Sequence, residues 1–492
     1  MLCPAIAVIL KPHMKKSLAV ILGLGFIVRL VCLGTRQLWT DELLQALIVR
    51  SSSLADFAAR LKHGMVFPAP LDYIVQEAFV FVLGDSNWAL RLHAVVFGTL
   101  SLWIFYRVGR RLFGAHPAIY CTVLFSFFPL HYHYSQEGRP YALVILLTLI
   151  SYDLLLRIIS RNESAGWGWV MLGVTLVLLL YSSLFAFAVI VCQVLTLACA
   201  GLVPSASTVG KVEELQDLRP ARGSDIAVFA VIGVLALALL VPWMQYAWSK
   251  PMVAHPRDIA NPKLVLAAIK ELGDNSYPVA GLLLLGVIIG ALAMLRHGKR
   301  QSLFWLLMWF GVPFPLVLAF DLWSGYPFSV REVVFATPPL ILISGYGLSF
   351  VGERFSLLQE LPSRVSSPAI LYAAAMIAGC VWIAQYRWRN EPVDWLGAAR
   401  TVEGMVREGD TVASPGVSLL LDYYAPALAQ FRTQDLDLKG NLLEGAQGSR
   451  RIVVCYDGTA PDPCAGFRSR AQSDPAWRRL ILRGFTLFVR GK

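Results

Sequence analysis

Residues 139–158, RPYALVILLTLISYDLLLRI, form a mostly apolar segment that is long enough to cross a membrane as one helix. About 20 helical residues span the hydrocarbon core of a bilayer, and a helix satisfies its backbone amides internally. Comparable segments recur over most of the 492 residues, which are 57% hydrophobic and only 15% charged. Soluble globular chains carry about 25% charged residues. The sequence therefore predicts an α-helical polytopic membrane protein.

Ten further segments of roughly spanning length lie on both sides of this one, so we expect about eleven transmembrane helices. They lie at 17–34, 88–107, 114–131, 167–182, 184–203, 225–247, 277–296, 302–320, 332–351 and 368–387. Residues 388–492 are polar and mixed in composition, and short strands such as RIVVCYD and FTLFVR follow helical segments there. This alternation predicts a small C-terminal α/β domain with a partly parallel sheet.

Basic residues between the predicted helices indicate the orientation, because cytoplasmic loops are enriched in Lys and Arg. They share one side if the N-terminus is cytoplasmic and the C-terminal domain is extracytoplasmic. The residues are Lys15, Lys16, Arg107, Arg110, Arg111, Arg157, Arg161, Lys211, Arg219, Arg222, Arg296, Lys299, Arg300, Arg354 and Arg364. The same bias explains the net charge of +11, and no nucleic-acid-binding motif is visible, so we expect no nucleic-acid partner.

This topology defines three regions. Residues 1–16 are a cytoplasmic N-terminus, and Met14-Lys15-Lys16 has the form of a native start, which would make 1–13 an upstream extension. Residues 17–387 form the transmembrane domain, and 388–492 the extracytoplasmic domain. A large outer loop at 35–87 contains an amphipathic helix at 38–49, with Thr40 as its N-cap, and an interfacial helix at 71–84.

Two of the 8 cysteines, Cys455 and Cys464, lie close together in the polar segment CYDGTAPDPC, whereas six lie singly in apolar segments. An oxidising compartment favours disulfides. We therefore expect a bridge between Cys455 and Cys464 if the C-terminal domain is extracytoplasmic.

Ionisable residues gather at the outer membrane level in three distant parts of the chain. Charged side chains at membrane depth are costly and usually functional. The three groups are Asp41 with Glu42; His131, His133, Glu137 and Arg139; and Arg331 with Glu332. This distribution predicts an active site at the outer interface.

Four motifs carry a family resemblance. They are WTDE at 39–42, the block SNWALRLHAVVFGTLSLWIFYRVGRRLFG at 86–114, YSQEGRPYAL at 134–143 and VREVVFATPPLILISGYGL at 330–348. In this order they resemble membrane glycosyltransferases of the GT-C type, and within them the bacterial branch related to protein O-mannosyltransferases (glycosyltransferase family 39) and the lipid A aminoarabinose transferase. The resemblance covers roughly residues 17–350, and YSQEGRPYAL is its most specific part. Two departures are FPAPLDY at 67–73, where the family has a His-Pro-Pro-Leu-Tyr element, and Glu332, where Tyr is usual.

The resemblance implies transfer of a sugar from a polyprenyl-phosphate donor to a lipid, glycan or protein acceptor at the outer face of the bacterial cytoplasmic membrane. Because phosphate is a good leaving group, the reaction needs a base and cations more than a general acid. Asp41 is then the base, oriented by Glu42, and attack inverts the anomeric carbon. Arg139 and Arg331 bind the donor phosphate. Glu137, Tyr141, His133 and Asp72 line the site.

Structural explanations stand beside these roles. Asp41 and Glu42 suit the first turn of a helix, Arg139 suits an ion pair with Glu137, and Arg331 suits an interfacial anchor. His131 and His133 suit an interfacial belt as well as a metal site, so no cofactor is assigned and a divalent cation is left open. The alternative function is a non-catalytic lipid-linked sugar flippase or another transporter. Uninterrupted apolar helices with charge gathered at one face favour the enzyme.

Overall fold

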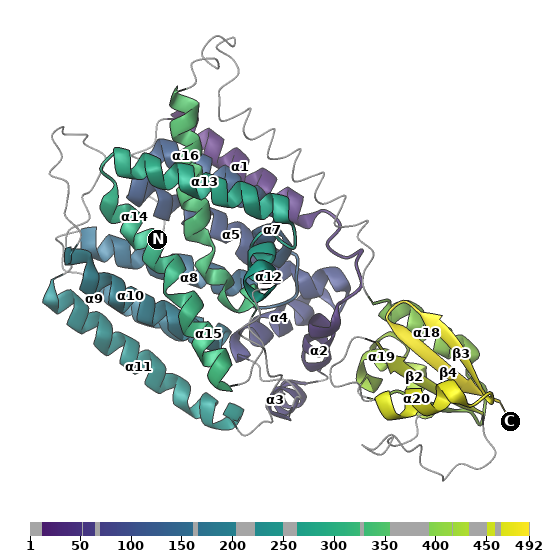
Figure 1. Cartoon of the computed structure of the whole chain (residues 1–492). Helices are drawn as coiled ribbons and strands as arrows, with labels where there is room; N and C mark the ends of the chain where they lie inside the picture. The colour runs from purple at the N-terminus through teal and green to yellow at the C-terminus, as the bar shows by residue number, and fades with distance from the viewer. Residues whose placement is uncertain are drawn as a thin grey trace. The chain divides into compact units, whose positions relative to one another are not determined.

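The computed structural model of the chain describes residues 12–51, 53–63, 69–160, 166–202, 222–248, 263–324, 329–354, 393–415, 417–431, 450–457 and 464–491. Within these ranges the chain forms two compact units (Figure 1). The first contains Met1–Leu33 and Ser52–Ala384, and the second contains Gly34–Ser51 and Gln385–Lys492. The predicted outer loop at 35–87 is thus divided, because its first part groups with the C-terminal region.

The first unit is a bundle of helices, as the recurrent apolar segments predict. Its elements are α1 (Pro12–Leu30), α3 (Leu54–His63), α4 (Pro70–Leu83), α5 (Asn87–Phe113), α6 (Ala115–Phe127), α7 (Pro129–Tyr134), α8 (Tyr141–Ser160), α9 (Gly166–Ser182), η1 (Leu184–Ala186), α10 (Phe187–Cys199), η2 (Ala200–Leu202), α11 (Gly223–Trp248), α12 (Lys263–Leu272), α13 (Tyr277–Arg296), α14 (Arg300–Gly311), α15 (Pro313–Ser324), η3 (Val330–Ala336) and α16 (Pro338–Arg354).

The expectation of about eleven spans is not confirmed. Six helical segments of the described chain are long and apolar enough to cross a membrane, or seven if η3 and α16, which meet at a bend of 54°, count as one. Helices also occupy the predicted segments 17–34, 114–131 and 167–182. However, α1 carries two lysines and Arg29, and α6 and α9 have only 13 and 17 residues. The predicted span at 368–387 lies outside the described residues.

Small residues allow the helices of the bundle to pack closely. α13 runs beside α16 (Figure 1), and a Cβ at Gly290 of α13 would collide with the backbone oxygen of Ile343 in α16. Close backbone approach at small residues is typical of helix packing in membranes. Large side chains fill the space elsewhere, as where Tyr152 of α8 stacks on Trp309 of α14 with ring centroids 3.7 Å apart. Most buried apolar residues of the bundle form one large core, and a smaller separate cluster joins α1, α5 and α6.

The second unit combines α2 (Thr40–Val49) with an α/β domain. The domain contains α18 (Trp395–Met405), β1 (Thr411–Ala413), α19 (Ser418–Tyr424), η5 (Pro426–Phe431), β2 (Arg451–Tyr456), α20 (Ala465–Ser473), β3 (Trp477–Leu482) and β4 (Phe485–Arg490). The strand order is β1-β2-β4-β3, with β1 and β2 parallel and the other pairs antiparallel. The predicted α/β domain with a partly parallel sheet is thus present. The strand β3 was not predicted, because its sequence, WRRLIL, contains two adjacent arginines.

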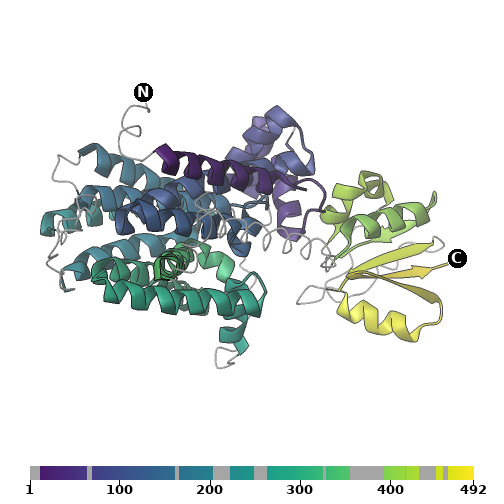
Figure 2. The same cartoon turned by 90° about the horizontal axis from the view of Figure 1, so that it is seen from above.

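The two faces of this sheet are covered by different helices. Alternate residues of a strand point to opposite faces. On β4, Phe485 packs against Trp395 of α18, whereas Phe488 packs against Phe467 of α20. Figure 2 shows the same arrangement, with the green helices on one side of the sheet and the yellow helix α20 on the other.

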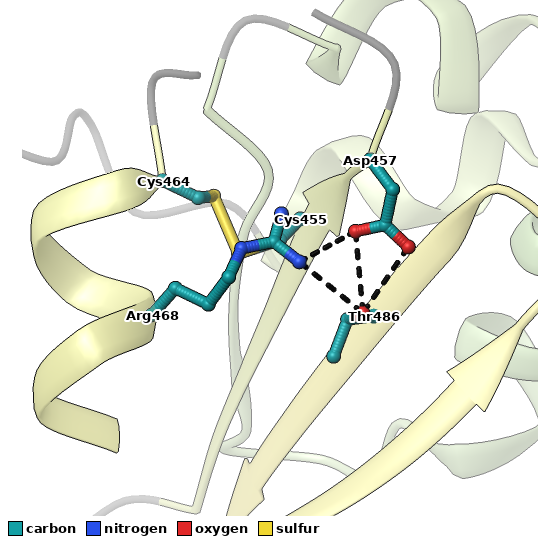
Figure 3. Close-up of polar contacts among 5 residues, drawn as sticks. All are labelled: Cys455, Asp457, Cys464, Arg468 and Thr486. Carbon is teal, nitrogen blue, oxygen red and sulfur yellow. Dashed lines mark hydrogen bonds and ion pairs between the residues drawn. A yellow bond between two sulfur atoms is a disulfide. The ribbon is translucent and has the colours of Figure 1, made fainter. Parts of the chain in front are cut away.

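A disulfide and a polar network join α20 to the sheet (Figure 3). Cys455 of β2 is bonded to Cys464, which directly precedes α20. Beside the disulfide, Arg468 donates hydrogen bonds to Asp457 and to Thr486 of β4, and Thr486 donates to Asp457. Because both cysteines are buried, the bridge is a structural element of this domain rather than an exposed redox site.

Candidate active site

The turn at 135–140 carries two predicted site residues, Glu137 and Arg139, and is fitted tightly against α5. Gly98 of α5 faces Ser135, and a Cβ at this glycine would collide with the Ser135 side chain. The backbone N–H of Arg139 donates to the Glu137 carbonyl at 2.8 Å, which closes the turn. The motif YSQEGRPYAL therefore forms a compact turn that packs so closely on α5 that only glycine fits at position 98.

The end of α1 holds the same turn from another side. The Gln136 amide donates to the backbone oxygens of Arg29 at 2.8 Å and of Val31 at 2.9 Å. The Arg29 side chain is fully buried and donates to Nδ1 of His131 at 2.9 Å and to the Gly25 oxygen at 2.9 Å. Since arginine only donates hydrogen bonds, Nδ1 of His131 is the acceptor and carries no proton.

His131 is therefore a neutral residue of this junction. Burial, and then the charge of Arg29, hold the pKa of His131 well below its usual range. The ring also stacks on Phe125, with centroids 3.8 Å apart. Of the two interpretations of His131, its packed position in the junction agrees with the structural one. The sequence did not suggest the pairing with Arg29, because 102 residues separate the two.

His133 lies between two carboxylates. Its Nδ1 lies 2.7 Å from Oδ1 of Asp274, and its Nε2 lies 3.6 Å from Oε2 of Glu137. The Asp274 side chain is only 3% exposed. Asp274 and Asn275 both have positive φ angles, 53° and 63°, in the loop between α12 and α13. Such conformations are costly for residues other than glycine and often occur at functional sites.

Sequence reasoning missed Asp274 and its neighbour Glu271. Glu271, near the end of α12, accepts hydrogen bonds from the Val330 N–H at 2.7 Å and the Ser329 hydroxyl at 3.0 Å, which lie at the start of η3. One short segment thus contacts both α7, through Asp274, and η3, through Glu271. The available signal was two acidic residues in KELGDN at 270–275, close to the predicted outer end of a span.

Arg331 and Glu332 follow Val330, the first residue of η3. The guanidinium Nε lies 3.3 Å from Oε1 of Glu332, and the Arg331 side chain stays 31% exposed. A partly exposed ion pair of this kind contributes little to stability. The Arg331 guanidinium is accessible to solvent, and an anionic group could therefore reach it and displace the solvent.

Two tyrosines show that these groups converge. The rings of Tyr134 and Tyr141 lie 4.5 Å apart. Burial raises the pKa of Tyr134, the neighbouring Tyr141 and Glu137 raise it further, and the charge of Arg331 opposes them. Arg139 and Arg331 both interact electrostatically with Tyr141. η3, which carries Arg331, packs against α8, which begins at Tyr141 directly after the turn that carries Glu137 and Arg139. The structure thus places these four predicted site residues in one region of the bundle, with His133 beside Glu137.

Asp72 is placed differently. It lies on α4 and is fully buried, with Oδ1 3.4 Å from Nε2 of His93 on α5, which is also fully buried. The edges of Phe79 and Phe97 flank the His93 ring. These surroundings are those of a buried polar contact between two packed helices.

Asp41 and Glu42 lie in the first turn of α2, in the second unit. The helix begins at Thr40, so Trp39 rather than Thr40 is the N-cap. Glu42 is buried, and its Oε2 accepts a hydrogen bond from the Trp39 N–H at 3.3 Å. This capping contact at Trp39 explains why the helix starts one residue earlier than predicted. Asp41 is partly exposed. The two neighbouring carboxylates therefore have different environments.

No group of three or more His, Cys, Asp or Glu side chains arranged to hold a metal ion occurs among the residues that the structure describes.

Comparison with known proteins agrees with the resemblance read from the motifs. The model of the family "Dolichyl-phosphate-mannose-protein mannosyltransferase" matches residues 68–201, which include the α5 block and the turn after α7. No curated protein matches the chain by sequence.

Solved structures with the same fold cover nearly the whole chain. ArnT from Cupriavidus metallidurans in the apo state superposes with a TM-score of 0.59 at 13% identity, over 97% of this chain and 98% of ArnT. ArnT bound to undecaprenyl phosphate gives 0.56 at 14% identity, over 96% and 98%. The apo oligosaccharyltransferase from Archaeoglobus fulgidus gives 0.52 at 13% identity, over 87% of this chain and 65% of that one. The predicted GT-C type of fold is confirmed.

Proposed function

We propose that this chain, a multi-pass membrane protein with the GT-C type of fold, transfers one sugar from a polyprenyl-phosphate donor to an acceptor at the outer face of the bacterial cytoplasmic membrane. The family match and the fold support a glycosyltransferase with a lipid-linked donor. The outer-face location, the orientation with a cytoplasmic N-terminus, and inversion at the anomeric carbon are parts of the proposal.

The observation that supports it best is that η3, which carries Arg331, packs against α8, which begins at Tyr141 directly after the turn that carries Arg139. These arginines come from segments 192 residues apart in the sequence. Two guanidinium groups in one region of the bundle offer a fork of donors to an anion that carries several oxygens. The undecaprenyl phosphate of the ArnT complex is an anion of this class.

In the proposed reaction the two arginines bind the donor phosphate and stabilise the charge that grows on it as the bond to the sugar breaks. Preorganised donors of this kind contribute about 2.7–4 kcal/mol each to the transition state in well-studied enzymes. Glu137, Tyr141 and His133 line the site, and the contact between His133 and Asp274 fixes the imidazole. We do not include Asp72, because it is fully buried beside His93.

Asp41 is the proposed base for the acceptor hydroxyl. Its partial exposure leaves the carboxylate accessible, whereas Glu42 is engaged with the start of its own helix. The base removes the acceptor proton as the acceptor oxygen bonds to the anomeric carbon from the face opposite the phosphate. The carbon–oxygen bond to phosphate breaks, and the polyprenyl phosphate leaves with that electron pair, so the configuration inverts.

A divalent cation enters the proposal only as a partner to be tested. Transfer that stops on addition of EDTA and returns with added magnesium or manganese would establish it.

The first experiment compares envelope glycolipids and glycoproteins, by mass spectrometry, from cells with and without this protein. We expect a mass difference of one sugar on one acceptor class, and the difference identifies both partners. The Asp41→Asn variant, at matched membrane levels, should give the profile of cells that lack the protein. Glu403→Gln, which removes an exposed charge from α18 of the same unit, is the matched control and should retain the product. Identical profiles with and without the protein would contradict the proposed function.

A further inference from the structure

The helix that carries Asp41 is built into the C-terminal unit. Residues 34–51 follow α1 in the sequence, yet they group with residues from 385 onward rather than with the bundle. α2 packs directly against α19. Its apolar face is buried, with Leu43 and Ala46 almost inaccessible to solvent. The surroundings of α2 are therefore set in large part by a domain more than 340 residues away in the sequence.

Gln37 makes the first of three contacts at the ends of α2. Its amide nitrogen donates to Oδ1 of Asp394 at 2.8 Å, and its amide oxygen accepts from the Leu396 N–H at 3.1 Å. Asp394 is itself the N-cap of α18 and accepts from the Gly397 N–H at 2.8 Å. One glutamine thus satisfies both sides of its amide at the start of a well-capped helix, which fixes its position.

Tyr424 makes the second contact, one residue along the chain. Its hydroxyl accepts from the Leu38 N–H at 3.0 Å and donates to the Leu38 oxygen at 3.4 Å. The hydroxyl therefore pairs with both polar groups of a single peptide residue, directly before the Trp39 N-cap. Asp41 lies three residues after Leu38, in the first turn of α2.

Arg50 makes the third contact, at the opposite end. Its guanidinium carbon lies 4.1 Å from the centre of the Tyr423 ring. The face of an aromatic ring attracts a cation, and the attraction is stronger where the cation is desolvated. Because α2 is held before its first residue and after its last, it can neither slide along its axis nor swing away from α19 without losing one of these contacts.

We infer that the C-terminal domain serves as the positioning element for the Asp41 carboxylate, with Tyr424 and Gln37 as its positioning residues. The inference rests on the proposed function, because it takes Asp41 as the base. Catalytic groups must be held close to their productive geometry, and an error of about 1 Å costs about a hundredfold in rate. The two hydrogen bonds of Tyr424 provide this restraint one helical turn from the carboxylate.

The test uses Tyr424→Phe in the full chain, expressed in cells that lack the parent for product formation and reconstituted in lipid nanodiscs for donor binding. This variant keeps the ring and its packing and removes only the hydroxyl that holds Leu38. Product formation in cells should fall at least tenfold at matched protein levels. The affinity for undecaprenyl phosphate, used as the probe of the donor site, should stay within twofold of the parent. Gln37→Leu, which removes both amide contacts, should act in the same direction.

A structural readout separates loss of positioning from unfolding. Hydrogen–deuterium exchange should rise at 37–43 in Tyr424→Phe, while the amides of β2 and β4 keep the parent's protection. The matched control is Tyr456→Phe, which also removes one hydroxyl from this unit but leaves α2 untouched, and it should change neither exchange nor product.

The outcomes distinguish the two proposals. If Asp41→Asn abolishes the product and Tyr424→Phe forms it at the parental rate, positioning by the C-terminal domain is refuted and the proposed function stands. If Asp41→Asn retains the product, Asp41 is not the base and the positioning role fails with it. Lost protection across β2 and β4 in Tyr424→Phe would show general unfolding of the domain and would also count against a local positioning role.

Discussion

Two arginine sites in the bundle use the same side chain in opposite ways. At the junction of α1 and α7, Arg29 is fully buried and donates to a neutral histidine and a backbone oxygen. At the start of η3, Arg331 is partly exposed and lies beside Glu332. The first guanidinium is directed to neighbours within the protein, whereas the second remains accessible. The difference suits the proposed roles: the accessible Arg331 binds the donor phosphate, and the buried Arg29 supports the turn that carries Glu137 and Arg139.

The largest expected effect concerns the accessible site. Arg331→Ala and Arg139→Ala should each lower the rate of product formation about 100- to 1,000-fold, since each removes one preorganised donor to the phosphate. The variants should also bind undecaprenyl phosphate more weakly and keep the parental thermal unfolding midpoint in detergent. Arg60→Ala removes an exposed arginine that pairs with Asp56, and it should leave product and binding unchanged. Full activity of both site variants would show that the two arginines do not bind the donor.

Substitutions at the buried junction of Arg29 and His131 should instead change the stability of the protein. Arg29→Met should lower the free energy of unfolding by about 1–3 kcal/mol, because Nδ1 of His131 loses its donor in a buried place. Arg29→Met with His131→Phe should recover most of the loss, because replacing both polar partners by apolar groups can be nearly neutral. Thermal unfolding in detergent measures both. Undecaprenyl phosphate affinity should stay parental, and a large loss of affinity in the double variant would remove the contrast between the two sites.

The pH dependence of stability sharpens the same contrast. Burial lowers the pKa of His131 in the folded state, so the unfolded state binds the proton more readily. The contribution of neutral His131 is complete above its unfolded pKa of about 6.5 and is lost as the pH falls below that value. The expected slope is up to about 1.4 kcal/mol per pH unit. His131→Gln keeps an acceptor for Arg29 but does not titrate, so its unfolding midpoint should fall less between pH 6.5 and 5. Parallel curves for parent and variant would contradict this account.

Sequence could predict the parts of this molecule that depend on local pattern. Long apolar segments gave helices at every described position where a span was expected. The motif at 134–143 suggested Glu137, Arg139 and Tyr141, whose roles in the site stay predictions. The predicted number of spans is not confirmed, because helix length is decided at the ends: α6 stops at Phe127 and α7 begins separately.

Long-range pairings could not be predicted, because no local pattern encodes them. Arg29 meets His131 across 102 residues, and Gln37 meets Asp394 across 357. The contact of Asp274 with His133 joins residues 141 positions apart, and the polar loop sequence around Asp274 gives no sign of it. The strand β3 was missed for a related reason: its arginines point to solvent on a strand that pairs with β4 alone among the described residues.

The smallest effect tests the departure at Glu332, where relatives are expected to have Tyr. The Glu332 carboxylate competes with a donor phosphate for Arg331, since its Oε1 lies 3.3 Å from the guanidinium Nε. Glu332→Gln should therefore strengthen binding of undecaprenyl phosphate about two- to fivefold, in line with the small energy of a partly exposed ion pair. Added salt should shrink the difference between parent and variant, because it screens the competing charge. Glu408→Gln, which removes an exposed carboxylate from the second unit, controls for net charge and should leave the affinity unchanged. Weaker binding in Glu332→Gln would mean that Glu332 holds Arg331 in its binding geometry. The site at Arg331 would then depend on its ion pair, as the buried junction depends on the contact between Arg29 and His131.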